Sequence, residues 1–290
     1  MQQSDREKRV IVILGARSGT SALSGTLSLL GAGLPQNLMQ ANWANPKGYF
    51  EPQDIAELHD EILASVGSSW SDWREFPRDW FRSEAAAHYT ARLTAMFLED
   101  YRNASGLCIL KEPRICRLLP LWAEVFQTAG VAPLFCFIDR APDEVAASLA
   151  ARDGSSIEQG LLYYIRNHIE SERDTRTARR VFVQYDALLN DWREGVGRIN
   201  QALGTSFPLE STAATQVDDF LERNLRNQNA GQTEPADWIG SLACKIHRAF
   251  STLTTDPHDP VGLACMDHAR VAFSMRSDES RALQSLHGGP

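Results

Sequence analysis

A short segment near the start of the chain, VIVILGARSGTSAL (residues 10–23), has the residue types of an anion-binding loop. Its apolar run ends at Gly15, and Gly19 stands where a following helix would begin. Glycines let the backbone approach an anion closely, and the N-terminus of a helix offers N–H groups and the positive end of a dipole. Arg17 adds a planar guanidinium that suits phosphate oxygens. The segment therefore predicts a site for a phosphate or sulfate group.

Three hydroxyl groups in the same segment, those of Ser18, Thr20 and Ser21, would add hydrogen-bond donors. The common nucleotide-triphosphate loop reads GxxxxGK[ST], with a lysine directly after its second glycine. Thr20 occupies that place here, so the nucleotide version is not matched. A P-loop kinase of a small molecule, which would need that lysine and Mg²⁺, is an alternative that this difference disfavours. An ordinary strand-to-helix turn is the other interpretation.

A second basic position follows another apolar run, in the segment FIDRAPDEVAASLAARDG (residues 137–154). Arg140 lies just beyond the run, Pro142 suits the first position of a helix, and Ser148 lies about two turns into that helix. Arg140 and Ser148 could bind a second phosphate beside the first, although a capped helix with a solvated arginine also explains the segment. Asp139 resembles the metal-supporting acid of nucleotide hydrolases, but that motif needs the loop lysine that is missing.

Apolar patterning indicates the elements that would carry these residues. Four apolar runs lack polar alternation, as parallel strands buried on both faces do, and they predict strands at 9–14, 107–110, 132–138 and 181–183. Apolar stripes at helical spacing predict helices around 23–30, 55–66, 118–125 and 188–203. Because strands alternate with helices, we predict an α/β fold, with a P-loop-like parallel sheet flanked by helices.

The chain of 290 residues is expected to form a single domain, residues 1–290, with a core at about 9–205. Residues from about 65 to 105 contain a tryptophan-rich stretch followed by a long helical pattern, and they would form a helical insertion. Residues from about 231 to 290 would form a helical C-terminal extension.

The composition limits which partners and which cellular location we expect for the protein. A hydrophobic content of 43% and a mean hydropathy of -0.30 fit a soluble globular protein. No apolar run reaches the roughly 20 residues that span a bilayer, and the polar start MQQSDREKR does not resemble a signal peptide. The net charge of -8 argues against nucleic acid or an anionic membrane as the main partner.

The cysteines and histidines do not form a recognisable metal or disulfide pattern. The five cysteines are scattered and lack a CxxC pair, which predicts reduced, mostly buried thiols and a cytoplasmic location. There is no HExxH motif and no Cys/His cluster, so we expect no metal site.

Taken together, these segments resemble the sulfotransferases that use 3′-phosphoadenosine-5′-phosphosulfate (PAPS), and the bacterial group more than the cytosolic animal enzymes. The segment Arg17–Ser21 is similar to the family's 5′-phosphosulfate loop, in which Lys or Arg precedes Ser-Gly-Thr. Arg140 and Ser148, eight residues apart, match the Arg and Ser that bind the 3′-phosphate. In VFVQYDALLNDW, Tyr185 matches a tyrosine near the adenine. The segments follow the family's order and cover about residues 9–205.

The resemblance implies an activity and a set of ligands. The enzyme would move a sulfuryl group from PAPS to a hydroxyl of a small molecule or carbohydrate, without a metal, and release adenosine 3′,5′-bisphosphate (PAP). The implied cofactor-binding residues are Arg17, Ser18, Gly19, Thr20, Ser21, Arg140, Ser148 and Tyr185. A non-catalytic adenosine-phosphate binding module is the alternative from another class, because it would also need the two arginines and Ser148.

The segment LKEPRICRLLPLW places Lys111 at a strand end, where bacterial members have a lysine. We predict that Lys111, with Arg17 and the loop N–H groups, stabilises the bridging or leaving oxygen of the transferred group. The animal enzymes carry a catalytic histidine two residues after the matching lysine, and this chain has Pro113 there. The histidine mechanism therefore does not carry over.

Glu51 is the predicted general base, because sulfotransferases without that histidine use a glutamate that follows the first helix. Acidic residues are common near helix starts, so a structural role is the alternative. Asp54 and His59 are the next candidates for the base. His59 lies two helical positions from the face of Ile55 and Ile62, and we expect it at the surface.

Aromatic residues crowd the region before and within the insertion, which would lie on the acceptor side. They could stack on a sugar or a phenolic ring, although buried packing is their more common use. These residues are Trp43, Phe50, Trp70, Trp73, Phe76, Trp80 and Phe81.

Overall fold

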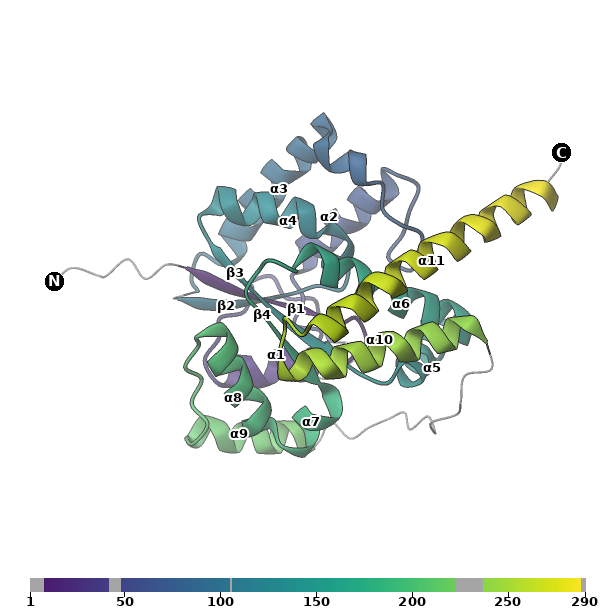
Figure 1. The fold of residues 1–290 in the computed structure, drawn as a ribbon. Helices are drawn as coiled ribbons and strands as arrows, with labels where there is room; N and C mark the ends of the chain where they lie inside the picture. The colour runs from purple at the N-terminus through teal and green to yellow at the C-terminus, as the bar shows by residue number, and fades with distance from the viewer. Residues whose placement is uncertain (1–7, 42–47, 105, 223–236, 288–290) are drawn as a thin grey trace.

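A four-stranded parallel sheet forms the centre of the molecule (Figure 1). The computed structural model describes residues 8–41, 48–104, 106–222 and 237–287. The strands are β1 (Arg9–Leu14), β2 (Leu107–Lys111), β3 (Ala132–Asp139) and β4 (Arg180–Gln184). All neighbouring strands pair in parallel, in the order β2-β1-β3-β4. The predicted parallel α/β fold is confirmed, and each predicted strand lies within an observed one.

Helices cover both faces of this sheet, as Figure 1 shows. Along β1, Val10 and Val12 belong to one apolar core, and Ile11 and Ile13 belong to the other. The first core includes residues of α2 to α6, α10 and α11, and the second includes residues of α1 and α7 to α9. The helices are α1 (Thr20–Leu29), α2 (Gln53–Ala64), the 3-10 helix η1 (Arg78–Arg82), α3 (Glu84–Asp100), α4 (Ile115–Ala129), α5 (Pro142–Asp153), α6 (Ile157–Asp174), α7 (Tyr185–Asn190), α8 (Trp192–Leu203), α9 (Thr212–Glu222), α10 (Trp238–Thr255) and α11 (Pro260–His287).

The strand order determines where a ligand can bind. Since β1 pairs with β2 on one side and with β3 on the other, the loop after β1 lies between the ends of these two strands. Open parallel sheets bind ligands outside the carboxyl ends of their strands, at the point where the strand order reverses. Residues at the carboxyl ends of all four strands therefore meet at one edge.

One predicted helix proved wrong, because residues 188–203 form parts of two helices. α7 ends at Asn190 and α8 begins at Trp192. Asp191 between them has a non-helical backbone, and its carboxylate accepts a hydrogen bond of 3.1 Å from the N–H of Glu194. An aspartate in this position caps the N-terminus of a new helix, which explains the break.

The predicted insertion and the described part of the predicted C-terminal extension are largely helical. Between α2 and β2, an irregular stretch leads through η1 to the long helix α3. Of the predicted C-terminal extension, residues 231–236 and 288–290 lie outside the described residues. α10 packs against β4 and α6 and buries Ile246 and Phe250 in the first core. α11 packs on α10 and then projects beyond the rest of the molecule (Figure 1).

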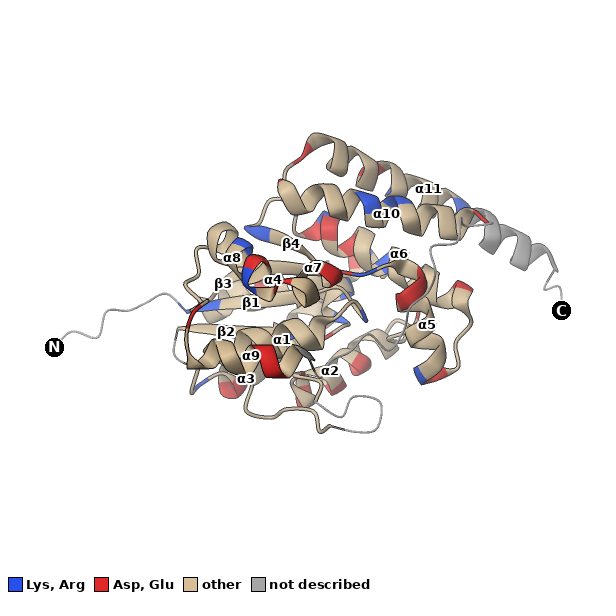
Figure 2. Ribbon diagram, turned by 90° about the horizontal axis from the view of Figure 1, so that it is seen from below, with Lys and Arg blue, Asp and Glu red and all other residues tan. Residues whose placement is uncertain are grey.

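Charged side chains are spread over the helices, and the thiols are free and mostly buried, as the sequence predicted for the thiols. Figure 2 shows Lys and Arg interspersed with Asp and Glu along the helices. Within the described ranges, no helix has the length and apolarity needed to cross a membrane. All five cysteines are free thiols; Cys108, Cys116 and Cys136 are buried, and Cys244 and Cys265 are partly exposed.

A buried carboxylate at the end of β3 connects the sheet to the C-terminal helices. Asp139 accepts hydrogen bonds from the Tyr164 hydroxyl at 2.9 Å and from His168 Nε2 at 3.1 Å, both on α6. Its other oxygen accepts from His247 Nδ1 on α10 at 2.6 Å. Burial acts against the charged form, but the hydrogen bonds from the two histidines outweigh it and lower the pKa of Asp139 to about 2.

This contact makes the stability of the fold depend on pH. Burial opposes protonation of His247, but Asp139 outweighs burial and raises the pKa of His247 above its ordinary value. The stabilisation is therefore complete between about pH 4, where Asp139 is ionised in both states, and about pH 6.5, and it is lost as pH rises through the pKa of His247 in the folded protein. We expect His247→Ala to lower the free energy of unfolding by about 1.5–3 kcal/mol near pH 5 and by less near pH 9.

Urea unfolding at both pH values measures this difference, with the exposed His258→Ala as the matched control. An equal loss of stability at both pH values would show that the protonated histidine contributes nothing.

Candidate functional site

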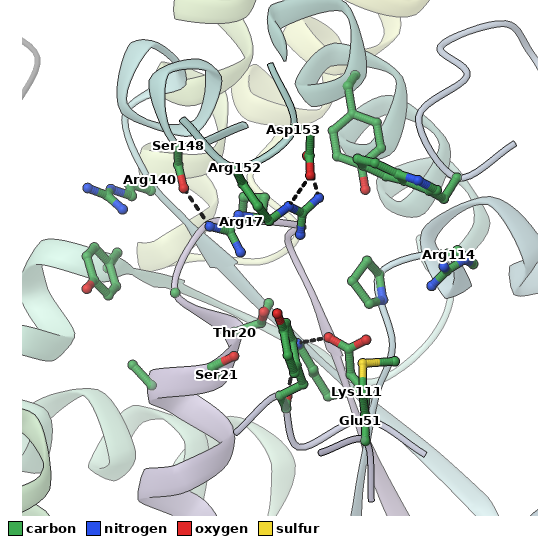
Figure 3. A pocket seen from close by; sticks show the side chains of 18 residues that line it. Arg17, Thr20, Ser21, Glu51, Lys111, Arg114, Arg140, Ser148, Arg152 and Asp153 are labelled. Atoms are coloured by element: carbon green, nitrogen blue, oxygen red, sulfur yellow. Dashed lines mark hydrogen bonds and ion pairs between the residues drawn. The ribbon is translucent and has the colours of Figure 1, made fainter. Parts of the chain in front are cut away.

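A pocket of about 510 Å³ lies at the edge of the sheet where the carboxyl ends of the strands meet (Figure 3). Nine of the ten residues that the sequence singled out for binding or catalysis line it: Arg17, Gly19, Thr20, Ser21, Glu51, Lys111, Arg140, Ser148 and Tyr185. Ser18 does not line the pocket, because its side chain is buried and its hydroxyl points back to the carbonyl of Ala16 at 3.5 Å. The structure thus brings residues from four strand ends into one cavity.

The loop after β1 has a backbone that few residues tolerate. Gly15 and Gly19 have φ values of 113° and 97°. A Cβ on Gly15 would lie 1.9 Å from the carbonyl oxygen of Ile138, and one on Gly19 would lie 2.1 Å from the ring of Tyr185. Arg17 is also left-handed, with φ 61°, a conformation that a non-glycine residue keeps only when its surroundings enforce it.

Arg17 is held in a way that leaves part of its guanidinium for a ligand. One Nη donates a hydrogen bond of 2.7 Å to the Ser148 hydroxyl on α5. Its Nε is buried and has no hydrogen-bond partner among the described residues. Burial, and then the positive charge of Arg152, lower the pKa of Arg17. The negative charge of an anion in the pocket would offset both effects.

Lys111 and Glu51 form an ion pair inside the pocket, with side chains only 5% and 7% exposed. The Lys111 ammonium also donates to the carbonyl oxygen of Tyr49 at 3.1 Å. Lys111 is therefore buried in the pocket wall rather than exposed on the surface. Burial raises the pKa of Glu51, and this effect outweighs the opposing charge of Lys111.

Two short backbone contacts fix the position of Glu51 just before α2. Its carbonyl accepts a hydrogen bond of 2.8 Å from the N–H of Met39, and Leu38 and Pro52 form an antiparallel bridge. Phe50 has a left-handed φ of 57° and packs its ring edge-on against Phe220. These contacts turn the Glu51 carboxylate toward Lys111.

The second predicted phosphate site lies beside the first. Arg140 follows β3, and its Nε donates to Glu144 at 2.5 Å. Its guanidinium carbon lies 5.0 Å from the centre of the Tyr185 ring, which follows β4. Ser148 contacts Arg17, so the two predicted anion sites share a hydrogen bond.

The other two candidates for the base occupy different surroundings. Asp54 is exposed on α2 and does not line the pocket. The prediction that His59 lies at the surface is wrong, since the residue is fully buried. Its Nε2 accepts a hydrogen bond of 2.9 Å from the Trp122 indole, and its Nδ1 faces the Glu112 carboxylate. Because both ring nitrogens are engaged, His59 cannot take a proton from a substrate in the pocket.

Sequence reasoning missed several residues that line the pocket, Arg152 and Arg114 above all. Arg152 lies four positions after Ser148 on α5, and residues spaced this way share a helix face, so the spacing could have indicated it. Arg114 follows Pro113 after β2. It pairs with Asp60 at 2.6 and 2.8 Å, and also with Glu112.

The crowded aromatic residues serve mainly for packing. Trp70 lines the pocket and packs edge-on against Tyr163 at 5.9 Å. Phe76 is buried between the rings of Trp80 and Phe81. Trp73 packs against Phe273, and Trp43 lies outside the described residues.

The described part of the chain contains no group of three or more His, Cys, Asp and Glu side chains arranged to hold a metal ion. Asp139, the residue that resembled a metal-supporting acid, is instead buried and engaged by three hydrogen-bond donors.

The role of His59 can be tested by stability. We expect His59→Ala to lower the free energy of unfolding by about 1–3 kcal/mol, because the Glu112 carboxylate stays buried after losing a hydrogen-bond donor. Urea denaturation measures the loss, with the exposed His88→Ala as the control. A variant as stable as the wild type would contradict this structural role.

Comparison with known proteins supports the fold. No protein-family model matches the chain, and no curated protein matches it. The sulfotransferase domain of the olefin synthase from Synechococcus PCC 7002 is similar in structure, with a TM-score of 0.50 and 14% identity, over 84% of this chain and 96% of that chain. The sulfotransferase domain from the curacin biosynthetic pathway gives a TM-score of 0.48 and 11% identity, over 82% of this chain and 96% of that one. The chain therefore has a sulfotransferase-like α/β fold.

Proposed function

We propose that this protein is a sulfotransferase that uses PAPS and a hydroxyl acceptor, a small molecule or a carbohydrate. The observation that carries the proposal is the combination in one pocket of a glycine loop, a buried arginine with an unsatisfied Nε, and a buried Glu51–Lys111 pair. The sulfotransferase-like fold supports the same conclusion.

The residues around the loop fit the anionic parts of the donor. Arg17 offers the part of its guanidinium that Ser148 does not engage, and Gly19 lets the Tyr185 ring lie where a Cβ would be. The N-terminus of α1 adds N–H groups that lack acceptors within the helix. We assign the 5′-phosphosulfate to this loop, the 3′-phosphate to Arg140 and Ser148, and the adenine to the neighbourhood of Tyr185.

PAPS, when bound, supplies a sulfuryl group on a phosphate leaving group. In our proposal Glu51 accepts the proton of the acceptor hydroxyl, whose oxygen forms the new bond to sulfur while the bond from sulfur to the phosphate oxygen breaks. The raised pKa of Glu51 makes the carboxylate a better proton acceptor. Lys111 and Arg17 hold positive charge near the departing oxygen, where negative charge develops.

Two alternatives make different demands on the same pocket. A small-molecule kinase would need a lysine after Gly19, where this chain has Thr20, and a free acid in place of the buried Asp139. A non-catalytic module would bind PAP but would not need the Glu51–Lys111 pair.

Donor binding tests the proposal directly. We expect PAP to bind without a metal, as measured by calorimetry, and Arg140→Ala to weaken binding by about 1.5–3 kcal/mol through loss of a charged hydrogen bond. Arg198→Ala, on the surface of α8, is the control and should bind PAP as the wild type does. Binding of ATP with Mg²⁺ but not of PAP would favour the kinase instead.

The proton acceptor is tested by Glu51→Gln, which keeps the size of the side chain and a carbonyl oxygen for Lys111. We expect PAPS-dependent transfer to fall by about 10²–10⁴-fold, the usual contribution of a general base, while PAP affinity holds. Glu57→Gln changes an exposed glutamate on the same helix and should leave transfer unchanged. Transfer at the wild-type rate in Glu51→Gln would remove Glu51 from the mechanism.

A further inference from the structure

The pocket contains an arginine for which the proposed donor site has no use. Arg152 stands in the last turn of α5, and its side chain is 23% exposed. It lines the pocket beside Arg17 (Figure 3), and its guanidinium lies over the ring of Trp70. Arg17 and Arg140 already face the positions assigned to the two phosphate groups, so Arg152 calls for a separate explanation.

The guanidinium of Arg152 is held rigidly by one edge and one face. Its Nε and one Nη donate to the two carboxylate oxygens of Asp153, each at 2.7 Å. Its central carbon lies 4.9 Å from the centre of the Trp70 ring, a distance typical of a cation–π contact. Trp70 in turn packs edge-on against Tyr163.

The remaining edge of Arg152 points into the pocket. Figure 3 shows the guanidinium nitrogens bound to Asp153 on one side and another nitrogen turned away from Asp153, toward the space above Lys111 and Glu51. A guanidinium fixed in this way needs no rearrangement to bind an anion, so little conformational entropy is lost on binding.

Arg114 also lines the pocket, but its positive charge is more fully neutralised than that of Arg152. Its guanidinium is shared between two carboxylates, those of Asp60 and Glu112. Three of its nitrogens donate to these groups. Arg152 has one carboxylate partner, Asp153, whose side chain is 26% exposed. Its positive charge also acts on Arg17, where it is the second cause, after burial, of the lowered pKa.

We propose that the acceptor carries an anionic group, a carboxylate or a phosphate ester, in addition to its hydroxyl, and that Arg152 binds that group. This inference rests on the proposed function, because it places the hydroxyl at Glu51 and the anionic group at the pocket-facing edge of Arg152. The Trp70 and Tyr163 rings form the apolar wall beside it. The acceptor class is thus a hydroxy acid or the phosphate ester of a polyol.

Matched pairs of acceptors test the proposal. 4-Hydroxybenzoate is compared with 4-hydroxybenzamide, and glucose 6-phosphate with glucose, so that the two pairs separate a carboxylate from a phosphate ester. For each pair the ratio of kcat/KM, anionic over neutral, is measured with PAPS in the wild type, in Arg152→Gln and in Arg198→Gln. We expect the wild type to prefer the anionic member of at least one pair by about tenfold or more.

The variants assign that preference to a residue. Arg152→Gln should lose most of it, with the ratio falling by about tenfold, and Arg198→Gln should retain it. Calorimetric binding of the same four compounds to the PAP complex gives a readout that does not depend on turnover. If neither anionic compound is preferred in binding or in transfer, or if Arg152→Gln leaves the preference intact, the inference is overturned.

PAP affinity separates this inference from the proposed function. Arg152→Gln should bind PAP nearly as well as the wild type. A loss of PAP affinity as large as that of Arg140→Ala would make Arg152 a donor ligand and overturn the inference while leaving the proposed function standing. If the wild type does not bind PAP at all, both are overturned.

Discussion

The buried contact between Glu51 and Lys111 is the constraint on which the site depends. Either charge alone, enclosed at the end of β2, would bear a large desolvation penalty, whereas the two together compensate each other. The contact also joins the end of β2 to the segment before α2, two parts of the chain that lie 60 residues apart. Burial raises the pKa of Glu51 by more than the charge of Lys111 lowers it. Glu51 therefore binds a proton more readily than an exposed glutamate does.

The strained loop depends on α5 as much as on its own glycines. Arg17 keeps a left-handed backbone, and its hydrogen bond to Ser148 fixes the direction of its side chain. One turn further along α5, Arg152 faces the same pocket. A single helix thus supports the loop proposed for the donor and also supplies the cation proposed for the acceptor. A displacement of α5 would change both sides of the pocket at once.

Much of the fold, and many of the residues that line the pocket, could be predicted because the signals are local. Apolar runs indicated all four strands, and parallel strands place their carboxyl ends at one edge, so Arg17, Lys111 and Arg140 had to converge. Long-range contacts could not be predicted in this way. His59 was expected at the surface from its helical position, but Glu112 from the end of β2 and Trp122 from α4 provide polar partners that let it be buried.

The segment that carries Trp70 is held in place by a different kind of contact. Trp70 lies in an irregular segment whose backbone carbonyls are held by buried arginines rather than by a sheet: Arg117 donates to the carbonyls of residues 69 and 74, and Arg166 to that of residue 73. Between these arginines, burial raises the pKa of Glu170 to about 7 against their positive charges. Hydrogen bonds from buried arginines thus hold this backbone, and Glu170 offsets part of their charge through its ion pair with Arg166. Trp70 is therefore positioned by side-chain contacts, whereas the residues at the strand ends are positioned by the sheet.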